Sequence, residues 1–170
     1  SANPTQIKTA GGSSAITASA ERKVFINGEL QGTAQGQVSL SSDNPAFVIT
    51  GTTVRVSENT TISTRSANIT ASCGGVSKSV TLTQPGRTES YVFTIDGGTS
   101  VNGTFESSGG TAKYTIVSQK TIVIDGNSTT VQANWSSSWN TSSFGSLGND
   151  GTLIIAENPN TTQRAAVIIL

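Results

Sequence analysis

Apolar and polar residues alternate along this chain in short runs that are separated by turn-forming residues. Val54 and Val56 alternate with polar residues before the polar stretch SENTT, and Ala67 and Ile69 alternate again after it. A period of two places successive side chains on opposite faces of a strand, so this stretch predicts a strand, a polar turn and a second strand. No stretch has helical periodicity, and β-branched residues are frequent. The pattern predicts an all-β fold.

The same pattern occurs a second time, from Leu153 onward. Five pairs of residues match at a constant separation of 99 positions: Glu58 and Glu157, Asn59 and Asn158, Arg65 and Arg164, Ala67 and Ala166, Ile69 and Ile168. Further upstream the two copies align at a separation of 98 positions, which matches Asn27-Gly28 with Asp125-Gly126. A repeat of this length indicates a duplicated domain, because solenoid repeats are much shorter.

The duplication predicts two tandem Ig-like β-sandwich domains, residues 1–86 and 87–170. The pair Pro85-Gly86 marks the boundary, because it cannot continue a strand ladder. In the first domain, Lys23–Glu29 predicts a hairpin with an Asn-Gly turn, and Gln31–Gln37 predicts a glycine-rich connection. The first domain ends in the alternating strand Val76–Gln84, and the second is expected to begin with strands at 91–95 and 101–105.

The second copy lacks the usual last strand. After Arg65 the chain continues to the strand VSKSVTLTQ, whereas after Arg164 the sequence stops at Leu170. A sandwich without this strand exposes an unpaired sheet edge, which proteins cover or pair. Residues 90–95 of the same chain could fill the vacancy, or a neighbouring subunit could donate a strand. We favour the first of these two sources.

Composition excludes several classes of partner. The formal net charge is zero and 12 % of the residues are charged, which argues against binding to nucleic acid or to an anionic membrane. The longest apolar run, Ala165–Leu170, is far too short to span a bilayer. No signal-peptide pattern opens the chain, and a start at Ser1 fits removal of an initiator methionine, so synthesis without export is expected.

The residue types that most enzymes use are scarce. The chain has no histidine and a single cysteine, Cys73, which removes the usual zinc sites and histidine-assisted nucleophiles. The acidic residues are isolated; a hydrolase would need a folded carboxylate pair, such as Asp125 with Asp150. Asn149–Gly151 and Asp96–Gly98 offer oxygen ligands but predict turns rather than a calcium loop. We expect no enzymatic activity, no metal and no cofactor.

Two sets of residues are candidates for binding. Glu58 with Arg65, and Glu157 with Arg164, could form a ligand site that occurs twice, or a structural ion pair or turn clamp across the hairpin that also contains Asn59 and Asn158. We favour the structural interpretation, because both copies keep the spacing.

The second set surrounds the two tryptophans. Trp135 and Trp139 lie four positions apart, which on a strand places both on one face. Their rings could stack on a sugar while Asn134 and Asn140 reach its hydroxyl groups. The alternative is that at least one tryptophan belongs to the core of the sandwich, and we favour that alternative.

The segments SENTT, Arg65-Ser66-Ala67 and SVTLTQPG in the first copy resemble BACON-type and related bacterial Ig-like domains. In the second copy, FESSGGTAKYTI and AENPNTTQRAAVII resemble the opening and the central hairpin of the same family. Such domains occur in surface proteins of gut Bacteroidetes and in their phages, including crAss-like phages. The resemblance implies an Ig-like sandwich with a role in adhesion, carbohydrate contact or the spacing of other modules.

These observations lead to two functional hypotheses. The first is a non-enzymatic accessory protein that decorates a phage capsid. Its partners would be the major capsid protein or other virion proteins, and mucin-like or host glycans could be weak ligands. The second is a carbohydrate-binding module on the bacterial cell surface.

Overall fold

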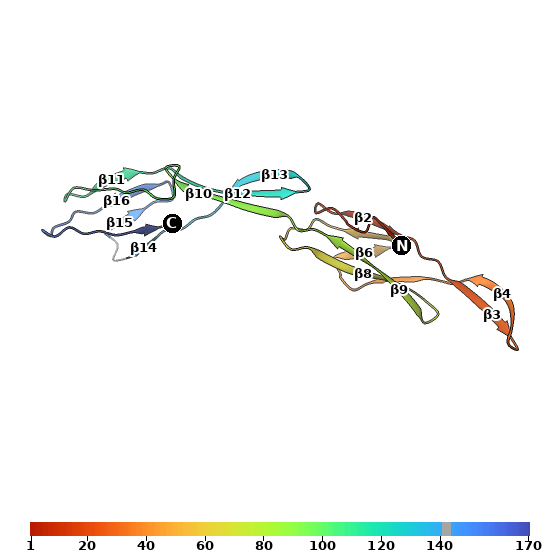
Figure 1. Cartoon of the computed structure of the whole chain (residues 1–170). Helices are drawn as coiled ribbons and strands as arrows, with labels where there is room; N and C mark the ends of the chain where they lie inside the picture. Colours follow the sequence, from red (N-terminus) through yellow and green to blue (C-terminus); the bar gives the residue numbers. More distant parts are fainter. Residues whose placement is uncertain (141–143) are drawn as a thin grey trace. The chain divides into compact units, whose positions relative to one another are not determined.

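The computed structural model describes residues 1–140 and 144–170, which fall into two compact units. The first unit is Ser1–Thr88 with Val123–Asn127, and the second is Glu89–Ile122 with Ser128–Leu170 (Figure 1). The described residues form strands and loops without a helix, so the all-β prediction is confirmed. It follows that these residues include no helix long and apolar enough to cross a membrane. The tandem domain limits 1–86 and 87–170 stay a prediction.

Two antiparallel sheets build the core of the first unit. One has the order β1-β2-β7-β6 and is formed by Ala2–Asn3, Gly12–Ile16, Thr53–Val56 and Phe47–Thr50. The other has the order β5-β8-β9 and is formed by Ser39–Ser42, Arg65–Cys73 and Val76–Gln84. Strands β8 and β9 pair without interruption from Arg65 opposite Gln84 to Cys73 opposite Val76. The predicted last strand is therefore present, and it covers one edge of β8.

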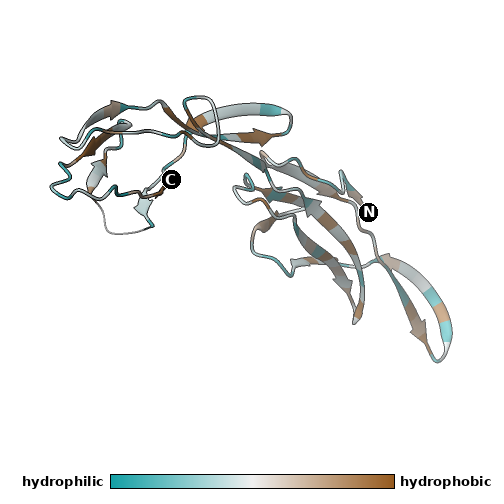
Figure 2. Cartoon of the chain, turned by 60° about the vertical axis from the view of Figure 1, so that its left-hand side comes forward, coloured by the Kyte–Doolittle hydropathy of each residue, from teal (hydrophilic) through white to brown (hydrophobic). Residues whose placement is uncertain are grey.

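Both sheets contribute to one apolar core. The first sheet supplies four buried residues from β2, β6 and β7: Ile16, Phe47, Val54 and Val56. The second sheet supplies Ala67 and Ile69 from β8 and Leu82 from β9, and the segment before β2 adds Ile7. The exposed Arg55 lies between the buried Val54 and Val56, as the two-residue period requires. Apolar segments accordingly recur along these strands (Figure 2). The first unit is a β-sandwich.

A hairpin outside this core belongs to the first unit. Strands β3 (Glu21–Ile26) and β4 (Glu29–Gln35) meet at Asn27 and Gly28, whose φ angles of 49° and 85° fit the predicted Asn-Gly turn. The prediction of a glycine-rich connection at Gln31–Gln37 is wrong, because residues up to Gln35 pair with β3 and a register shift after Val24 accommodates the segment. Every residue of both strands is exposed.

The second unit has smaller sheets. One has the order β11-β16-β15, formed by Gly110–Lys113, Thr152–Ile155 and Gly145–Leu147; the other pairs β14 (Ser138–Trp139) with β17 (Ile168–Ile169). A further sheet has the order β10-β12-β13, formed by Thr88–Ile95, Ile116–Ile124 and Asn127–Gln132. The strand predicted at 101–105 is wrong, because this segment is a loop.

Within the described part of the chain, β14 pairs with one edge of β17 and no strand pairs with the other. Residues 90–95 belong to β10, which pairs with β12 and not with β17. Our preferred source for the missing strand is therefore wrong, because the nine-residue β12 provides the hydrogen-bonding partner along β10 instead. Leu153, at 7 % exposure, is the only buried apolar side chain among the described residues of the second unit.

Candidate functional site

A shallow groove of about 570 Å³ lies on the outer side of the first sheet of the first unit. Strand β2 contributes Ser13, the turn before β6 contributes Pro45, β6 contributes Val48, and β7 and the residue after it contribute Arg55 and Ser57. Arg55 points outward because its two neighbours in β7 fill the core. The fold therefore places one guanidinium group, two hydroxyl groups and an apolar surface side by side.

This arrangement suits binding rather than catalysis. A guanidinium group presents five donors in a planar fork that fits carboxylates, phosphates and carbonyl oxygens. The second copy has Ile154 where the first has Arg55, so the charged version of this groove occurs once. Sequence analysis missed Arg55; the available signal was a single arginine on the outward side of an otherwise apolar strand.

The predicted hairpin residues form a buried network in the first unit. Asn59 is fully buried; its backbone N–H donates to the Thr9 carbonyl oxygen at 2.8 Å. Its side-chain Nδ2 donates to the carbonyl oxygens of Ser63 (2.8 Å) and Pro85 (3.1 Å), and its Oδ1 accepts from Thr61. One buried amide thus fixes the turn after β7.

Arg65 and Gln84 complete this network. The Arg65 Nε donates to the Gln84 Oε1 at 2.7 Å, and its Nη2 donates to the backbone carbonyl oxygens of Ser57 (2.8 Å) and Glu58 (3.3 Å). Arg65 therefore contacts Glu58 through the main chain and leaves the Glu58 side chain exposed. Gln84 is fully buried, and sequence analysis did not identify it as part of this network.

The second copy repeats part of the network. Asn158 Nδ2 donates to the Thr162 carbonyl oxygen at 3.0 Å, and the Arg164 guanidinium donates to the Ala156 carbonyl oxygen. Arg164 also lies over the Phe144 ring, at 4.3 Å from its centroid, and Glu157 is exposed.

The structure places the two tryptophans against different aromatic rings. Trp135 lies in the loop before β14, 6.4 Å from Phe93 between ring centroids. Trp139 lies in β14 and contacts the edge of Phe144 at 5.4 Å. Both tryptophans are half-buried.

The two asparagines differ in their contacts. Asn140 is bound to Val167: its backbone N–H donates to the Val167 carbonyl oxygen, and its Oδ1 accepts from the Val167 N–H. Asn134 is exposed. Of the predicted sugar-binding set, Trp135 and Asn134 are the residues whose polar and aromatic groups are least engaged by the fold.

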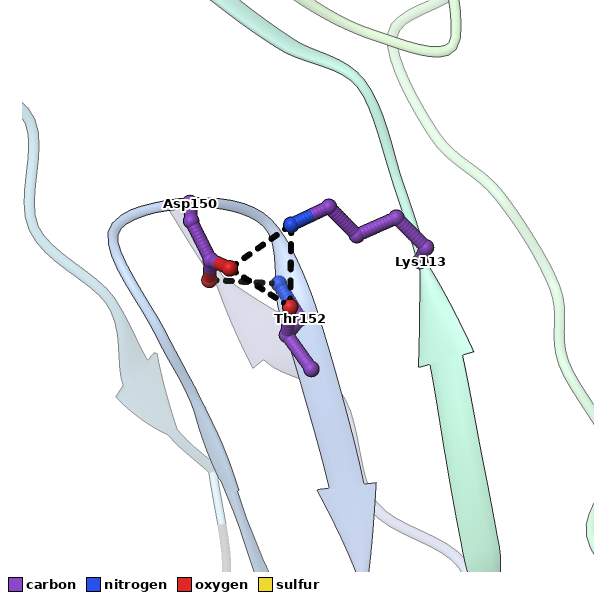
Figure 3. A network of polar contacts seen from close by, with 3 residues as sticks. All are labelled: Lys113, Asp150 and Thr152. Carbon is purple, nitrogen blue, oxygen red and sulfur yellow. Dashed lines mark hydrogen bonds and ion pairs between the residues drawn. The ribbon is translucent and has the colours of Figure 1, made fainter.

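The carboxylates accept hydrogen bonds from nearby turns and surface side chains. In residues 1–140 and 144–170, no three histidine, cysteine, aspartate or glutamate residues form a metal-binding group. Asp150 accepts from Lys113 Nζ (2.7 Å) and from the hydroxyl group and N–H of Thr152 (Figure 3), and these bonds hold the Asp150 pKa well below its usual range. The Asp125 carboxylate accepts from the N–H groups of Thr9 and Ala10, which lowers its pKa.

Comparison with known proteins gives one finding. Residues 32–85 match the BACON family model. This family is described as "Putative binding domain, N-terminal". The match covers β5 to β9, and with them most of the groove around Arg55 and the network of Asn59, Arg65 and Gln84. The searches of curated proteins and of solved structures gave no match. Residues 32–85 are thus similar in sequence to BACON domains.

Proposed function

We propose that this chain is a non-enzymatic binding module whose first unit attaches to a partner surface through the groove around Arg55. The observation that carries the proposal is the BACON match, which spans the groove residues Pro45 to Ser57. The open, shallow shape of the groove supports contact with a surface rather than the enclosure of a substrate.

Arg55 provides the test of this groove. Removing a guanidinium that meets a polar partner weakens binding by about tenfold or more. Arg55→Ala is expected to have this effect in a binding assay with the partner surface, while Lys78→Ala, at an exposed position of β9 in the other sheet, leaves the affinity unchanged. Equal affinity of the Arg55→Ala variant and the parent would exclude the groove as the contact.

The specific form that we propose is an accessory protein on a phage capsid, bound to the major capsid protein or to another virion protein. Exposed apolar residues of the first unit support attachment to protein: Phe25 and Ile26 of β3 are 57 % and 58 % exposed, and Leu30 of β4 is 52 % exposed. Apolar patches of this kind mark interaction surfaces. Mass spectrometry of purified virions is expected to detect the chain at structural stoichiometry, and its absence from virions would overturn the capsid role.

The alternative is a carbohydrate-binding module on the bacterial cell surface. The half-buried Trp135 ring beside the exposed Asn134 favours it, because aromatic faces stack on sugars and amides bind hydroxyl groups. A glycan array would then give a signal that Trp135→Ala removes without changing the circular dichroism spectrum. An array without a signal for the parent chain rejects this alternative.

A further inference from the structure

A cavity of about 500 Å³ lies at one end of the sandwich in the first unit. One of its walls is the end of the β8–β9 hairpin, and the other is formed by residues 17–21, which connect β2 to β3. The first sheet contributes a single residue to the lining, Ile16 of β2. The inward side of the hairpin end is therefore covered by a connecting segment instead of a strand.

Small side chains on both walls explain why this space is not filled. Residues 17–20 are threonine, alanine, serine and alanine, and the facing positions of β8 are Ala71 and Cys73, both half-buried. At the separation of 98 positions, the second copy has the larger Ile116 and Val117 in this segment. Because protein interiors are otherwise closely packed, a void of this size is a feature of the first copy that a ligand could use.

The lining combines an apolar surface with one free cation. Ile16, Ile69 and Val80 line the cavity and belong to the core or pack against it. Lys78 lies two residues from Val80 on the same side of β9, opposite Ala71, so its stem follows the apolar surface and its ammonium group reaches the opening. Among the residues that the structure describes, no carboxylate forms an ion pair with Lys78.

We propose that this cavity binds an alkyl chain that carries a carboxylate group. The chain occupies the space beside Ile69 and Val80, and the carboxylate accepts a hydrogen bond from Lys78 Nζ at the opening. The volume of about 500 Å³ is typical of sites for small molecules.

The lining decides between classes of ligand. A sugar would place hydroxyl groups against apolar side chains that offer them no hydrogen bond. A hydrocarbon suits these side chains, and a carboxylate on it gives the Lys78 ammonium group a partner. Glu21 ends the other wall, but it begins the exposed β3–β4 hairpin, whereas Lys78 occupies an inward-facing position of β9. An anionic head group therefore fits better than a cationic one.

The test uses the full chain with decanoate as the probe. Isothermal titration calorimetry is expected to show saturable binding of one decanoate per chain. Octanoate is expected to bind about tenfold more weakly, because two fewer methylene groups leave water. Decylamine, which has the same chain length and the opposite charge, is expected to bind at least about tenfold more weakly than decanoate. The proposal is overturned if decanoate shows no saturable binding at millimolar concentration, or if decylamine binds as tightly.

Cys73 reports where the probe binds, because it lines the cavity and is the only cysteine of the chain. Decanoate at about ten times its dissociation constant is expected to slow the alkylation of Cys73 by iodoacetamide about tenfold. An unchanged rate of alkylation would place the probe elsewhere and overturn the proposal.

Substitutions separate the alkyl chain from the head group. Ala71→Leu fills the cavity and is expected to abolish binding, while Ala15→Leu, at an exposed position on the outer side of β2, leaves it unchanged. Lys78→Met is expected to weaken binding of decanoate about tenfold and to leave binding of decanol unchanged. An equal effect on decanoate and decanol would exclude Lys78 as the partner of the carboxylate and overturn the assignment.

Two features keep the outcome clear. The comparison of decanoate with octanoate and decylamine leaves the chain unaltered, so it holds even if Ala71→Leu does not fold. The cavity shares no residue with the groove around Arg55, and the assay contains neither capsid nor glycan, so its result is independent of the proposed function.

Discussion

At the scale of single residues, Gln84 joins separate segments of the first unit through its side-chain hydrogen bonds. Its amide joins Arg65 to the carbonyl oxygens of three residues in two other segments, and it is fully buried. A buried polar group without its partner loses its hydration and gains nothing in return. Removing Gln84 is therefore expected to lower the stability of the first unit, because the donors and acceptors that it bonds would lose their partner.

We expect Gln84→Met, which preserves the length of the side chain, to lower the free energy of unfolding of the first unit by about 2–3 kcal/mol. The exposed Gln35 of β4 provides the control: Gln35→Met is expected to change stability by less than about 0.5 kcal/mol. Urea denaturation of both variants measures the difference. Equal stability of Gln84→Met and the parent would show that the network contributes nothing.

Carboxylates determine the response to acid. Asp43 accepts from the N–H and from the side-chain amide of Asn68, both at 2.8 Å, and these bonds lower its pKa below the value of 3.8 in an unfolded chain. Between the two pKa values the unfolded state binds more protons, so the contribution of Asp43 is complete above pH 3.8 and is lost as the pH falls through the folded pKa.

The expected result is a urea midpoint that decreases as the pH is lowered below about 4. Asp43→Asn is expected to reduce this decrease, because the amide does not titrate. The exposed Glu29 gives a control, Glu29→Gln, that keeps the dependence of the parent. An identical pH dependence of Asp43→Asn and the parent would contradict the assignment.

At the scale of elements, the β3–β4 hairpin combines apolar residues with full exposure. A two-stranded hairpin without a packed face is only marginally stable in water. Phe25 and Leu30 pair across it, at 57 % and 52 % exposure. These side chains add little to the folding of the first unit, and they remain available to a partner.

The double substitution Phe25→Thr and Leu30→Thr is therefore expected to change the free energy of unfolding by less than about 0.5 kcal/mol. Phe47→Ala, at a buried position of β6, is expected to cost about 3–5 kcal/mol in the same assay. A loss of several kcal/mol from the hairpin variant would mean that its apolar residues are packed in solution.

Elements with strict alternation or specific turn chemistry could be predicted from the sequence. Val54 and Val56, the strand Val76–Gln84 and the Asn27-Gly28 turn all occur as expected. The extension of β4 over Gly32 could not be predicted, because it depends on the pairing of this segment with β3 and not on local preference. The groove around Arg55 was missed for a similar reason, since residues from three separate segments meet there only in the folded chain.

At the scale of the whole molecule, the two copies of one pattern have unequal cores. Eight buried apolar residues form the core of the first unit, whereas Leu153 is the only buried apolar side chain in the described part of the second. Free energy of folding scales with apolar area removed from water, so the second unit is expected to be the less stable one.

The order of unfolding follows from this inequality. Both tryptophans of the chain, Trp135 and Trp139, belong to the second unit, so fluorescence reports that unit while far-UV circular dichroism reports both. In a urea titration we expect the fluorescence change to coincide with the first of two steps in circular dichroism. Leu82→Ala, in the core of the first unit, is expected to lower the free energy of unfolding of the second step alone, by about 2–5 kcal/mol. A single step common to both probes would contradict the inequality, because it would require the second unit to be as stable as the first.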